Sequence, residues 1–160
     1  MINPDEYLSL LTKEGINFFT GVPDSLLKEF CASLDKKKLK IKHVIAANEG
    51  GAVGLAIGNY IGTGSIPLIY LQNSGLGNII NPILSLASPK VYSIPMIIIM
   101  GWRGAPGIKD EPQHLHQGDI MENLVRTMDF PYEILSKNEK KAFLQTKKAL
   151  KVAKLKSSPF

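Results

Sequence analysis

Four short, largely apolar runs alternate with helical segments along the chain, and this alternation limits the possible folds more than any other feature. The runs cover residues 16–23, 41–47, 66–72 and 94–100. A strand with one face in water alternates apolar and polar residues, whereas a strand covered on both faces is apolar along its length. The pattern therefore predicts an α/β fold with three layers, in which helices cover both faces of a parallel sheet.

Helical segments are predicted between these runs and at both ends of the chain. They cover residues 4–15, 24–34, 50–62, 76–87, 119–128 and 137–156. The segment 50–62 is uncharged and rich in Gly and Ala, so we expect a buried helix there. Pro82 lacks an amide hydrogen and should give its helix an irregular start or a kink. A polar loop is expected from Gly101 to about Gln117, and a short strand at 132–135.

The length and charge of the chain are typical of one globular domain, residues 1–160. The net charge of +5 is concentrated at one end: residues 1–135 hold 11 Lys and Arg against 13 Asp and Glu, whereas residues 136–160 hold 8 against 1. Apolar residues such as Phe143 and Leu150 recur at helical spacing among these lysines, which predicts a surface helix with a solvated basic face. Because no aromatic platform or reader motif accompanies the charge, no nucleic-acid partner is expected.

Neither a membrane span nor a disulfide is expected. The longest apolar runs are too short to cross a bilayer, and residues 1–11 lack a basic leader with a small-residue cleavage site. These features favour a cytoplasmic location. The single cysteine, Cys31, cannot pair within the chain and falls in the middle of a predicted helix, where a core or partly buried thiol is expected.

Polar residues and glycines gather at the carboxyl ends of the four predicted strands. The segments are residues 21–25, 48–51, 72–75 and 101–104. Ligands of open parallel sheets bind beyond these ends, so the four segments form the candidate site. The alternative is that they are ordinary turns, because Gly, Asn, Asp and Ser fill turns in all proteins.

Several well-known catalytic and binding motifs are absent. The sequence has no phosphate-loop lysine and no nucleophile-elbow serine, and the Gly-x-Gly at 75–77 lacks the third glycine of a dinucleotide site. His114 and His116 stand two apart and could face one side of an extended segment. A transition-metal site would need further ligands at matched distances, such as Glu111 and Asp119, and no metal site is expected here.

Glu49 is an isolated acid between the predicted strand ending at Ala47 and the helix that follows. Carboxylates are seldom buried without a partner. Desolvation should raise the pKa of Glu49 toward neutrality, and a carboxyl between its two protonation states can relay a proton. Alternatively, Glu49 caps the helix by accepting bonds from backbone N–H groups. The residues alone leave both roles open.

Five segments together resemble a known enzyme family. In chain order, they are GVPDSLL, ANEGGAVGLAIGNY, LQNSGLGNIINPILSL, SIPMIIIMGWRG and DEPQHLHQG. Residues 1–135 resemble the pyrimidine-binding domain of the phosphonopyruvate decarboxylases, which depend on thiamine diphosphate. The alpha subunit of the sulfopyruvate decarboxylases is a close relative with the same general pattern.

The resemblance gives Glu49 a specific role. In the family, the glutamate between this strand and helix bonds N1′ of the cofactor's aminopyrimidine ring and supports the proton transfer that activates the cofactor. The resemblance also implies cofactor contacts from Pro23, Gln72, Asn73 and Ser74. It implies decarboxylation of 3-phosphonopyruvate to phosphonoacetaldehyde and carbon dioxide.

Further residues are assigned by the same resemblance. Asp24 and His114 are candidates for proton transfer, although many relatives place the acid two residues after the proline, where this chain has Ser25. A small anionic 2-oxo acid would be contacted by Ser25, Arg103, Lys109 and His116. A guanidinium in particular suits a phosphonate, because its fork matches two oxygens at once.

One departure from the family concerns the diphosphate. The family holds diphosphate and Mg²⁺ with a second domain that carries a Gly-Asp-Gly motif, whereas here Gly118-Asp119 is followed by Ile120. We therefore expect this chain to be inactive alone and to need a diphosphate-binding domain or subunit, in a homo-oligomer or a hetero-oligomer. The alternatives are the alpha subunit of a sulfopyruvate decarboxylase and a non-catalytic flavodoxin-like binding module.

Overall fold

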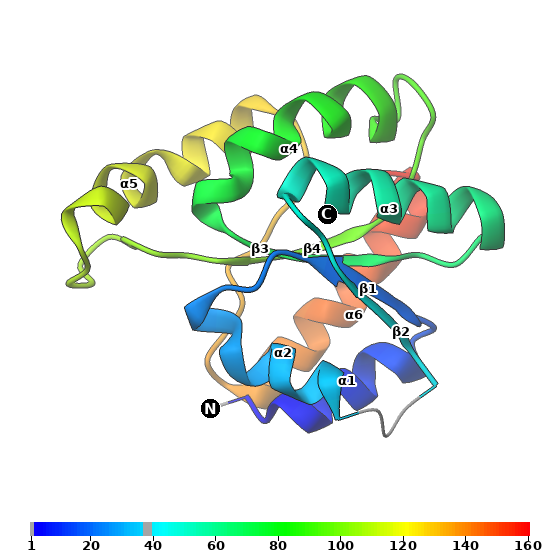
Figure 1. Ribbon diagram of the computed structural model, residues 1–160, viewed down its shortest axis with the longest axis horizontal. Coiled ribbons are helices and arrows are strands. Elements are labelled where there is room, and N and C mark those ends of the chain that lie inside the picture. The colour runs from blue at the N-terminus through cyan, green and yellow to red at the C-terminus, as the bar shows by residue number, and fades with distance from the viewer. Residues whose placement is uncertain (1, 37–39) are drawn as a thin grey trace.

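The four predicted strands form one parallel sheet in the order β2-β1-β3-β4 (Figure 1). The computed structural model describes residues 2–36 and 40–160. The strands are β1 (Phe18–Gly21), β2 (Lys42–Ile45), β3 (Leu68–Gln72) and β4 (Ile97–Gly101). In the register of the sheet, Phe19 lies opposite His43 of β2 and Leu68 of β3. The carboxyl ends of all four strands consequently lie at one end of the sheet.

Helices cover both faces of this sheet, as predicted. They are α1 (Pro4–Lys13), α2 (Lys28–Asp35), α3 (Glu49–Thr63), α4 (Leu76–Pro82), α5 (Pro112–Thr127) and α6 (Glu139–Lys156). Figure 1 shows α3, α4 and α5 on one face and α1, α2 and α6 on the other. Asn3, Asn48 and Asn138 begin α1, α3 and α6, because each side chain accepts a bond from a free backbone N–H of the first turn. The three-layer α/β fold is confirmed.

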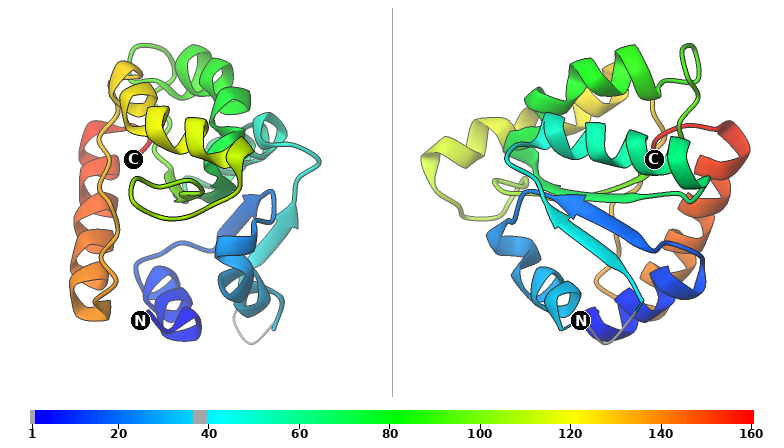
Figure 2. Two further views of the ribbon diagram at one scale, coloured as in Figure 1. Left: turned by 90° about the vertical axis from the view of Figure 1, so that its left-hand side faces the viewer. Right: turned by 45° about the vertical axis from the view of Figure 1, so that its right-hand side comes forward.

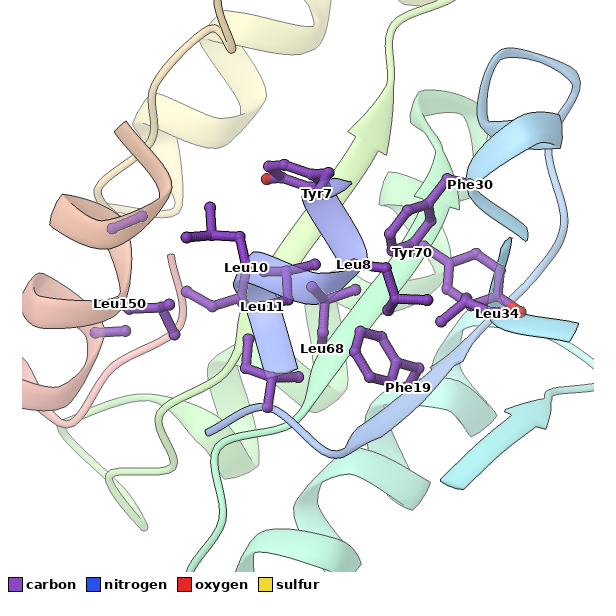
Figure 3. Close-up of a cluster of buried hydrophobic side chains, with 14 residues drawn as sticks. Tyr7, Leu8, Leu10, Leu11, Phe19, Phe30, Leu34, Leu68, Tyr70 and Leu150 are labelled. Carbon is purple, nitrogen blue, oxygen red and sulfur yellow. The ribbon is translucent and has the colours of Figure 1, made fainter. Parts of the chain in front are cut away.

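The core between the sheet and α1, α2 and α6 is closed and rich in aromatic rings. Figure 3 shows Leu11 of α1 among Phe19, Leu68 and Leu150, side chains that come from two strands and from α6. The hydroxyl groups of Tyr7 and Thr146 lie 2.8 Å apart in this core and link α1 to α6. The basic helix α6 thus has a buried side and a lysine-rich outer side, as predicted.

The opposite core is made by the inner side of α3 together with α4 and the sheet. Ala52, Val53 and Ala56 are fully buried against it. The outer side of α3 is different, because Leu55 is 41% exposed and Ile61 is 71% exposed. The prediction of a buried helix is therefore wrong for the outer side of α3. The sheet and α4 cover its inner side, and no part of the chain that the structure describes covers its outer side.

The structure corrects two predictions between β4 and α6. The loop after β4 ends before Gln117, because α5 already begins at Pro112, whose fixed φ suits the first helical position. Residues 132–135 are irregular and not a strand. They lie across a cavity from β4 and so have no strand neighbour beside them.

Three further expectations have clear outcomes. The helix predicted over 76–87 changes character at Pro82, where α4 passes into one π-helical turn, Ile83–Ala87, which confirms the expected irregularity. Cys31 is half-buried in α2, and burial raises the pKa of its thiol. Within the described residues, the structure contains no helix of the length and apolarity that crossing a membrane requires.

Candidate functional site

Glu49 opens α3 directly after β2, at the end of the sheet where ligands are expected. The residue that caps the helix is Asn48, whose Oδ1 accepts a hydrogen bond from the backbone N–H of Gly51 at 2.8 Å. The carboxyl of Glu49 takes no part in this cap. The helix-cap alternative is therefore wrong, and the side chain of Glu49 is free for another role.

The carboxyl of Glu49 is directed toward α4. Its Oε2 accepts a hydrogen bond from Nδ2 of Asn78 at 2.8 Å. Its Oε1 lies against Gly75, so closely that a Cβ on residue 75 would sit 2.5 Å from it. Within residues 2–36 and 40–160, no hydrogen-bond donor reaches Oε1. Glu49 is half-buried and thus presents one oxygen that is held and one that is free beside a glycine.

The segment after β3 connects this corner to the end of β4. Asn73 is buried, and its side chain donates to the carbonyl oxygen of Arg103 at 2.9 Å while its Oδ1 accepts from the Arg103 amide at 3.0 Å. Both ends of the Asn73 side chain are thus engaged with the chain itself. Gln72 donates to the hydroxyl oxygen of Ser74 at 3.0 Å, and Ser74 is exposed at the surface. Asn73 fixes the loop, whereas the side chains of Gln72 and Ser74 bond only each other among the described residues.

Asp24 lies at the end of β1 and is buried, with a side chain that begins a short 3-10 turn, Ser25–Leu27. Its Oδ2 accepts from the amide of Leu26 at 3.0 Å and lies against Gly101, where a Cβ would come within 2.2 Å. Its Oδ1 is buried and has no hydrogen-bond partner among the described residues. A buried carboxylate oxygen without a donor is costly, so this atom is suited to accept a bond from a ligand. The preceding Pro23 is exposed.

Arg103 is engaged by an acid that the sequence analysis missed. Its Nε donates to Oδ2 of Asp110 at 2.7 Å, and its Nη2 pairs with Oδ1 of the same carboxylate. The hydrogen bonds from Arg103 hold the pKa of Asp110 well below its usual range, and the same pairing raises the pKa of Arg103. Nη1 of Arg103 donates to the hydroxyl of Ser25 at 3.0 Å. The guanidinium therefore connects the loop between β4 and α5 to the turn Ser25–Leu27 that follows β1.

The two histidines lie on α5, not on an extended segment. Residues two apart on a helix point in widely different directions, so the expectation that His114 and His116 face one side is wrong. His114 is half-buried, and its carbonyl oxygen lies where a Cβ on Gly104 would come within 2.0 Å. His116 and Lys109 are exposed. Among the described residues, no three His, Cys, Asp or Glu side chains gather closely enough to hold a metal ion.

Two residues of the site were missed in the sequence, and the role of a third was not foreseen. Asn78 stands 29 positions after Glu49, and Asp110 stands seven after Arg103 in a loop of glycines and prolines. The only local signal was the acid that follows an arginine in the same loop. Gly75 was noted within a weak Gly-x-Gly pattern, but its contact with Glu49 depends on how α3 and α4 pack.

Comparison with known proteins identifies the family of the chain. A family model described as "Thiamine pyrophosphate enzyme, N-terminal TPP binding domain" matches residues 5–124. The chain is 36% identical over 135 residues to phosphonopyruvate decarboxylase of Streptomyces hygroscopicus, in a match that covers 84% of this chain and 33% of that protein. It therefore spans about a third of the length of this relative.

Two further relatives extend the comparison. The chain is 38% identical over 118 residues to the alpha subunit of sulfopyruvate decarboxylase from Methanococcus maripaludis, covering 74% of this chain and 68% of that subunit. Its fold is similar to that of benzoylformate decarboxylase from Polynucleobacter necessarius, with a TM-score of 0.54 and 25% identity over 64% of this chain and 19% of that one. The resemblance inferred from the sequence is confirmed. Because the family model matches well over half of its length, the chain belongs to the family of N-terminal TPP binding domains of thiamine pyrophosphate enzymes.

Proposed function

We propose that this chain is the pyrimidine-binding part of a thiamine-diphosphate-dependent decarboxylase that converts 3-phosphonopyruvate to phosphonoacetaldehyde and carbon dioxide. The observation that carries the proposal is the Glu49 carboxyl at the end of the sheet, with Oε2 held by Asn78 and Oε1 free beside Gly75. Such a carboxyl can exchange a proton with a ring nitrogen placed next to Oε1.

The residues around Glu49 fit one half of the cofactor. The glycine at position 75 lets the Glu49 side chain lie close against the backbone, and a side chain at position 75 would displace the carboxyl. Gln72 and Ser74 add polar side chains in the segment that leads to Gly75, where they bond each other. When bound, thiamine diphosphate supplies the electron-accepting ring that the loss of carbon dioxide requires. The contribution of Glu49 is to hold and return a proton at Oε1.

The other half of the cofactor needs a partner. The described residues contain no cluster that could hold Mg²⁺, so we assign Mg²⁺ and the diphosphate to a domain or subunit beyond residues 1–160. The outer side of α3 is the surface we assign to that partner, because it begins at Glu49 and exposes Leu55 and Ile61. A partner seated there would bury apolar surface and exclude water from Glu49 at the same time. The assembly would then be a homo-oligomer or a hetero-oligomer.

The substrate anion requires a positively charged contact. The candidate cations of this chain differ in whether an internal ion pair already engages them. Arg103 is already paired with Asp110, although its Nη1 lies at the surface near Ser25. Lys109 is exposed and has no ion-pair partner in the described parts of the chain. We propose Lys109 and His116 as the movable contacts to the phosphonate, and Asp24 and His114 as the groups that transfer protons near the reacting carbon.

A sulfonate substrate is the second candidate. It is favoured by the 38% identity to an alpha subunit of which this chain matches 68%. Sulfonate and phosphonate are both tetrahedral anions that bind similar cationic side chains. The proposed contacts, Lys109 and His116, therefore suit either anion. On this reading the chain would be one of two subunits.

The test is to measure carbon dioxide release by the native-length assembly, with thiamine diphosphate and Mg²⁺, from phosphonopyruvate and from sulfopyruvate in parallel. A higher kcat/KM for phosphonopyruvate supports the first candidate. A higher kcat/KM for sulfopyruvate overturns it in favour of the second. Absence of activity on both, in an assembly that binds the cofactor, would overturn both and leave a non-catalytic flavodoxin-like binding module.

A further inference from the structure

Helix α5 packs on the loop after β4 through two glycines, backbone against backbone. A Cβ on Gly118 of α5 would come within 1.8 Å of the carbonyl oxygen of Gly104. A Cβ on Gly104 would come within 2.0 Å of the carbonyl oxygen of His114. Figure 2 shows the loop turning back beside the first turns of α5. We call the contact of Gly104 with Gly118 and His114 the glycine joint, and it leaves no room for a side chain on either glycine.

Trp102, which the proposed function does not use, holds the same joint. It directly follows β4, and its Nε1 donates to the carbonyl oxygen of Gly118 at 3.0 Å. The N–H of a tryptophan that is withdrawn from water usually finds a partner. Here the partner is the helix residue that also touches Gly104. Gly118 is therefore held at two points, by a hydrogen bond and by a close contact.

The loop side of the joint is itself fixed by Asn73. The buried side chain of Asn73 bonds both the amide and the carbonyl oxygen of Arg103. Asn73 begins a short 3-10 turn, Asn73–Gly75, which also contacts α5. This turn ends at Gly75, against which the carboxyl of Glu49 lies. One continuous set of contacts therefore leads from Glu49 to α5.

The ring of His114 depends on the backbone of α5 for its position. His114 lies in the first turn of this helix and is half-buried. Among the residues that the structure describes, no hydrogen-bond partner fixes its ring. A displacement of α5 on the loop would therefore move His114 relative to Glu49, although both side chains would be unchanged.

We propose that Gly118 and Trp102 are positioning residues that set His114 relative to Glu49. The inference rests on the proposed function, in which Glu49 and His114 both transfer protons. A group that transfers a proton must come within hydrogen-bond reach of the reacting atom. A misplacement of about 1 Å can lower the rate by about 100-fold. Gly118 and Trp102 exert this effect through α5 and need no contact with cofactor or substrate.

The ion pair in the same loop has a different role. Arg103 and Asp110 engage each other through their side chains, whereas the glycine joint is made of backbone atoms on both sides. Loss of one charge leaves Asn73 bonded to the backbone of Arg103 and α5 packed against Gly104. Activity should therefore depend more on the glycine joint than on the ion pair.

The first test is a double-mutant cycle in the native-length assembly with thiamine diphosphate and Mg²⁺. Gly118→Ala should lower kcat for carbon dioxide release by about 10-fold to 100-fold, although alanine is the better helix former. In a His114→Ala background the same change should cost less than about 3-fold, because it acts through His114. Gln117→Ala, at an exposed position of the same helix, is the control and should keep activity.

A milder variant covers the case in which Gly118→Ala does not fold. Trp102→Phe keeps an aromatic ring but removes the N–H that bonds Gly118. It should lower kcat by about 3-fold to 10-fold. This loss should also disappear in the His114→Ala background, which a merely structural role of Trp102 would not produce.

A measurement without turnover separates the positioning role from the proposed function. The chain has three histidines, so the ring signals of His43, His114 and His116 can be followed by NMR in the 160-residue chain. Gly118→Ala and Trp102→Phe should shift the signals of His114. The signals of His43 should stay in place, because its ring is bonded to Asp35 and Tyr70 on the other face of the sheet.

The outcomes decide the two proposals separately. The positioning role is overturned if Gly118→Ala keeps full kcat, or if its cost is the same with and without His114. It is also overturned if the His114 signals do not move, or if those of His43 move as far. An assembly that binds the cofactor but is inactive on both 2-oxo acids overturns the proposed function, and the NMR comparison then decides the positioning role by itself.

Discussion

Two corners of the same sheet end hold charged groups in opposite ways. At the β4 corner, the guanidinium of Arg103 donates hydrogen bonds to Asp110 and Ser25. The carboxylate of Asp110 accepts further hydrogen bonds from the amides of Gly104 and Glu111. At the β2 corner, Glu49 has Asn78 as its side-chain partner and keeps Oε1 free. At the β4 corner, the charged groups find their hydrogen-bond partners within the chain, whereas at the β2 corner one carboxylate oxygen of Glu49 does not.

This difference separates structural charges from functional ones. An ion pair with several internal hydrogen bonds holds a loop in place, because breaking it leaves unpaired groups behind. A half-buried carboxyl with a free oxygen and a glycine beside it contributes less to the fold and is available to a ligand. Changes at the Glu49 corner should therefore reduce activity with little loss of stability, and changes at the Arg103 corner should do the reverse.

The largest effect is expected for Glu49→Gln. The amide keeps the shape of the side chain but cannot accept and return a proton, so kcat of the native-length assembly should fall by about 100-fold to 10,000-fold. The thermal midpoint should change little. Carbon dioxide release measures the expected fall in kcat, and a thermal melt of the same preparation measures the midpoint. Near wild-type turnover would show that the free oxygen of Glu49 has no part in proton transfer.

Gly75→Ala tests the close contact between residue 75 and the Glu49 side chain at the same corner. The backbone of Gly75 has a φ of −78°, which alanine adopts without strain, so the only cost is the new Cβ against Glu49. Displacement of the carboxyl should lower kcat/KM by about 100-fold. Gly77→Ala is the matched control, because a Cβ there meets no other atom within 4 Å. The control should keep activity and gain stability. Equal activity in the two variants would rule out the steric role of Gly75.

A smaller effect is expected for Asn78→Ala. This change removes the donor that holds Oε2 of Glu49 but leaves the carboxyl itself in place. Loss of such a positioning bond should lower activity by about 10-fold. Asn81→Ala on the same helix is the control, since Asn81 bonds Ser85 and not Glu49. If pH profiles of the two variants coincide, Asn78 does not act through Glu49.

The parts of this molecule that follow local patterns were predictable. Apolar runs located β1 to β4, and the imino acid at Pro82 located the change from α4 to a π-helical turn. Isolated Glu49 at a strand end was also visible in the sequence, because a lone acid in an apolar setting is unusual. Each of these signals lies within a few residues of the structure that it predicts.

Features that depend on distant neighbours were not predictable in the same way. Residues 132–135 have strand character, but a strand needs a partner, and the cavity stands where that partner would be. The outer side of α3 has an apolar composition, yet its burial depends on what else covers it. The bond from Asn78 to Glu49 joins two helices whose packing no local pattern specifies.

The smallest effect on activity is expected for Asp110→Asn, which should instead reduce stability. The variant loses the charge that Arg103 pairs with, so the loop between β4 and α5 should loosen and the thermal midpoint should fall by a few degrees. The pKa of Asp110 is lower in the folded protein than in the unfolded chain, where it is about 3.9. Ionised Asp110 therefore stabilises the fold above that pH, and its contribution is lost as the pH falls through the lower, folded value. Urea unfolding from pH 7 down to pH 2 should show a constant difference between wild type and variant above about pH 4, and a difference that shrinks below it. A constant difference across this range, or a loss of activity as large as that of Glu49→Gln, would contradict the contrast between the two corners.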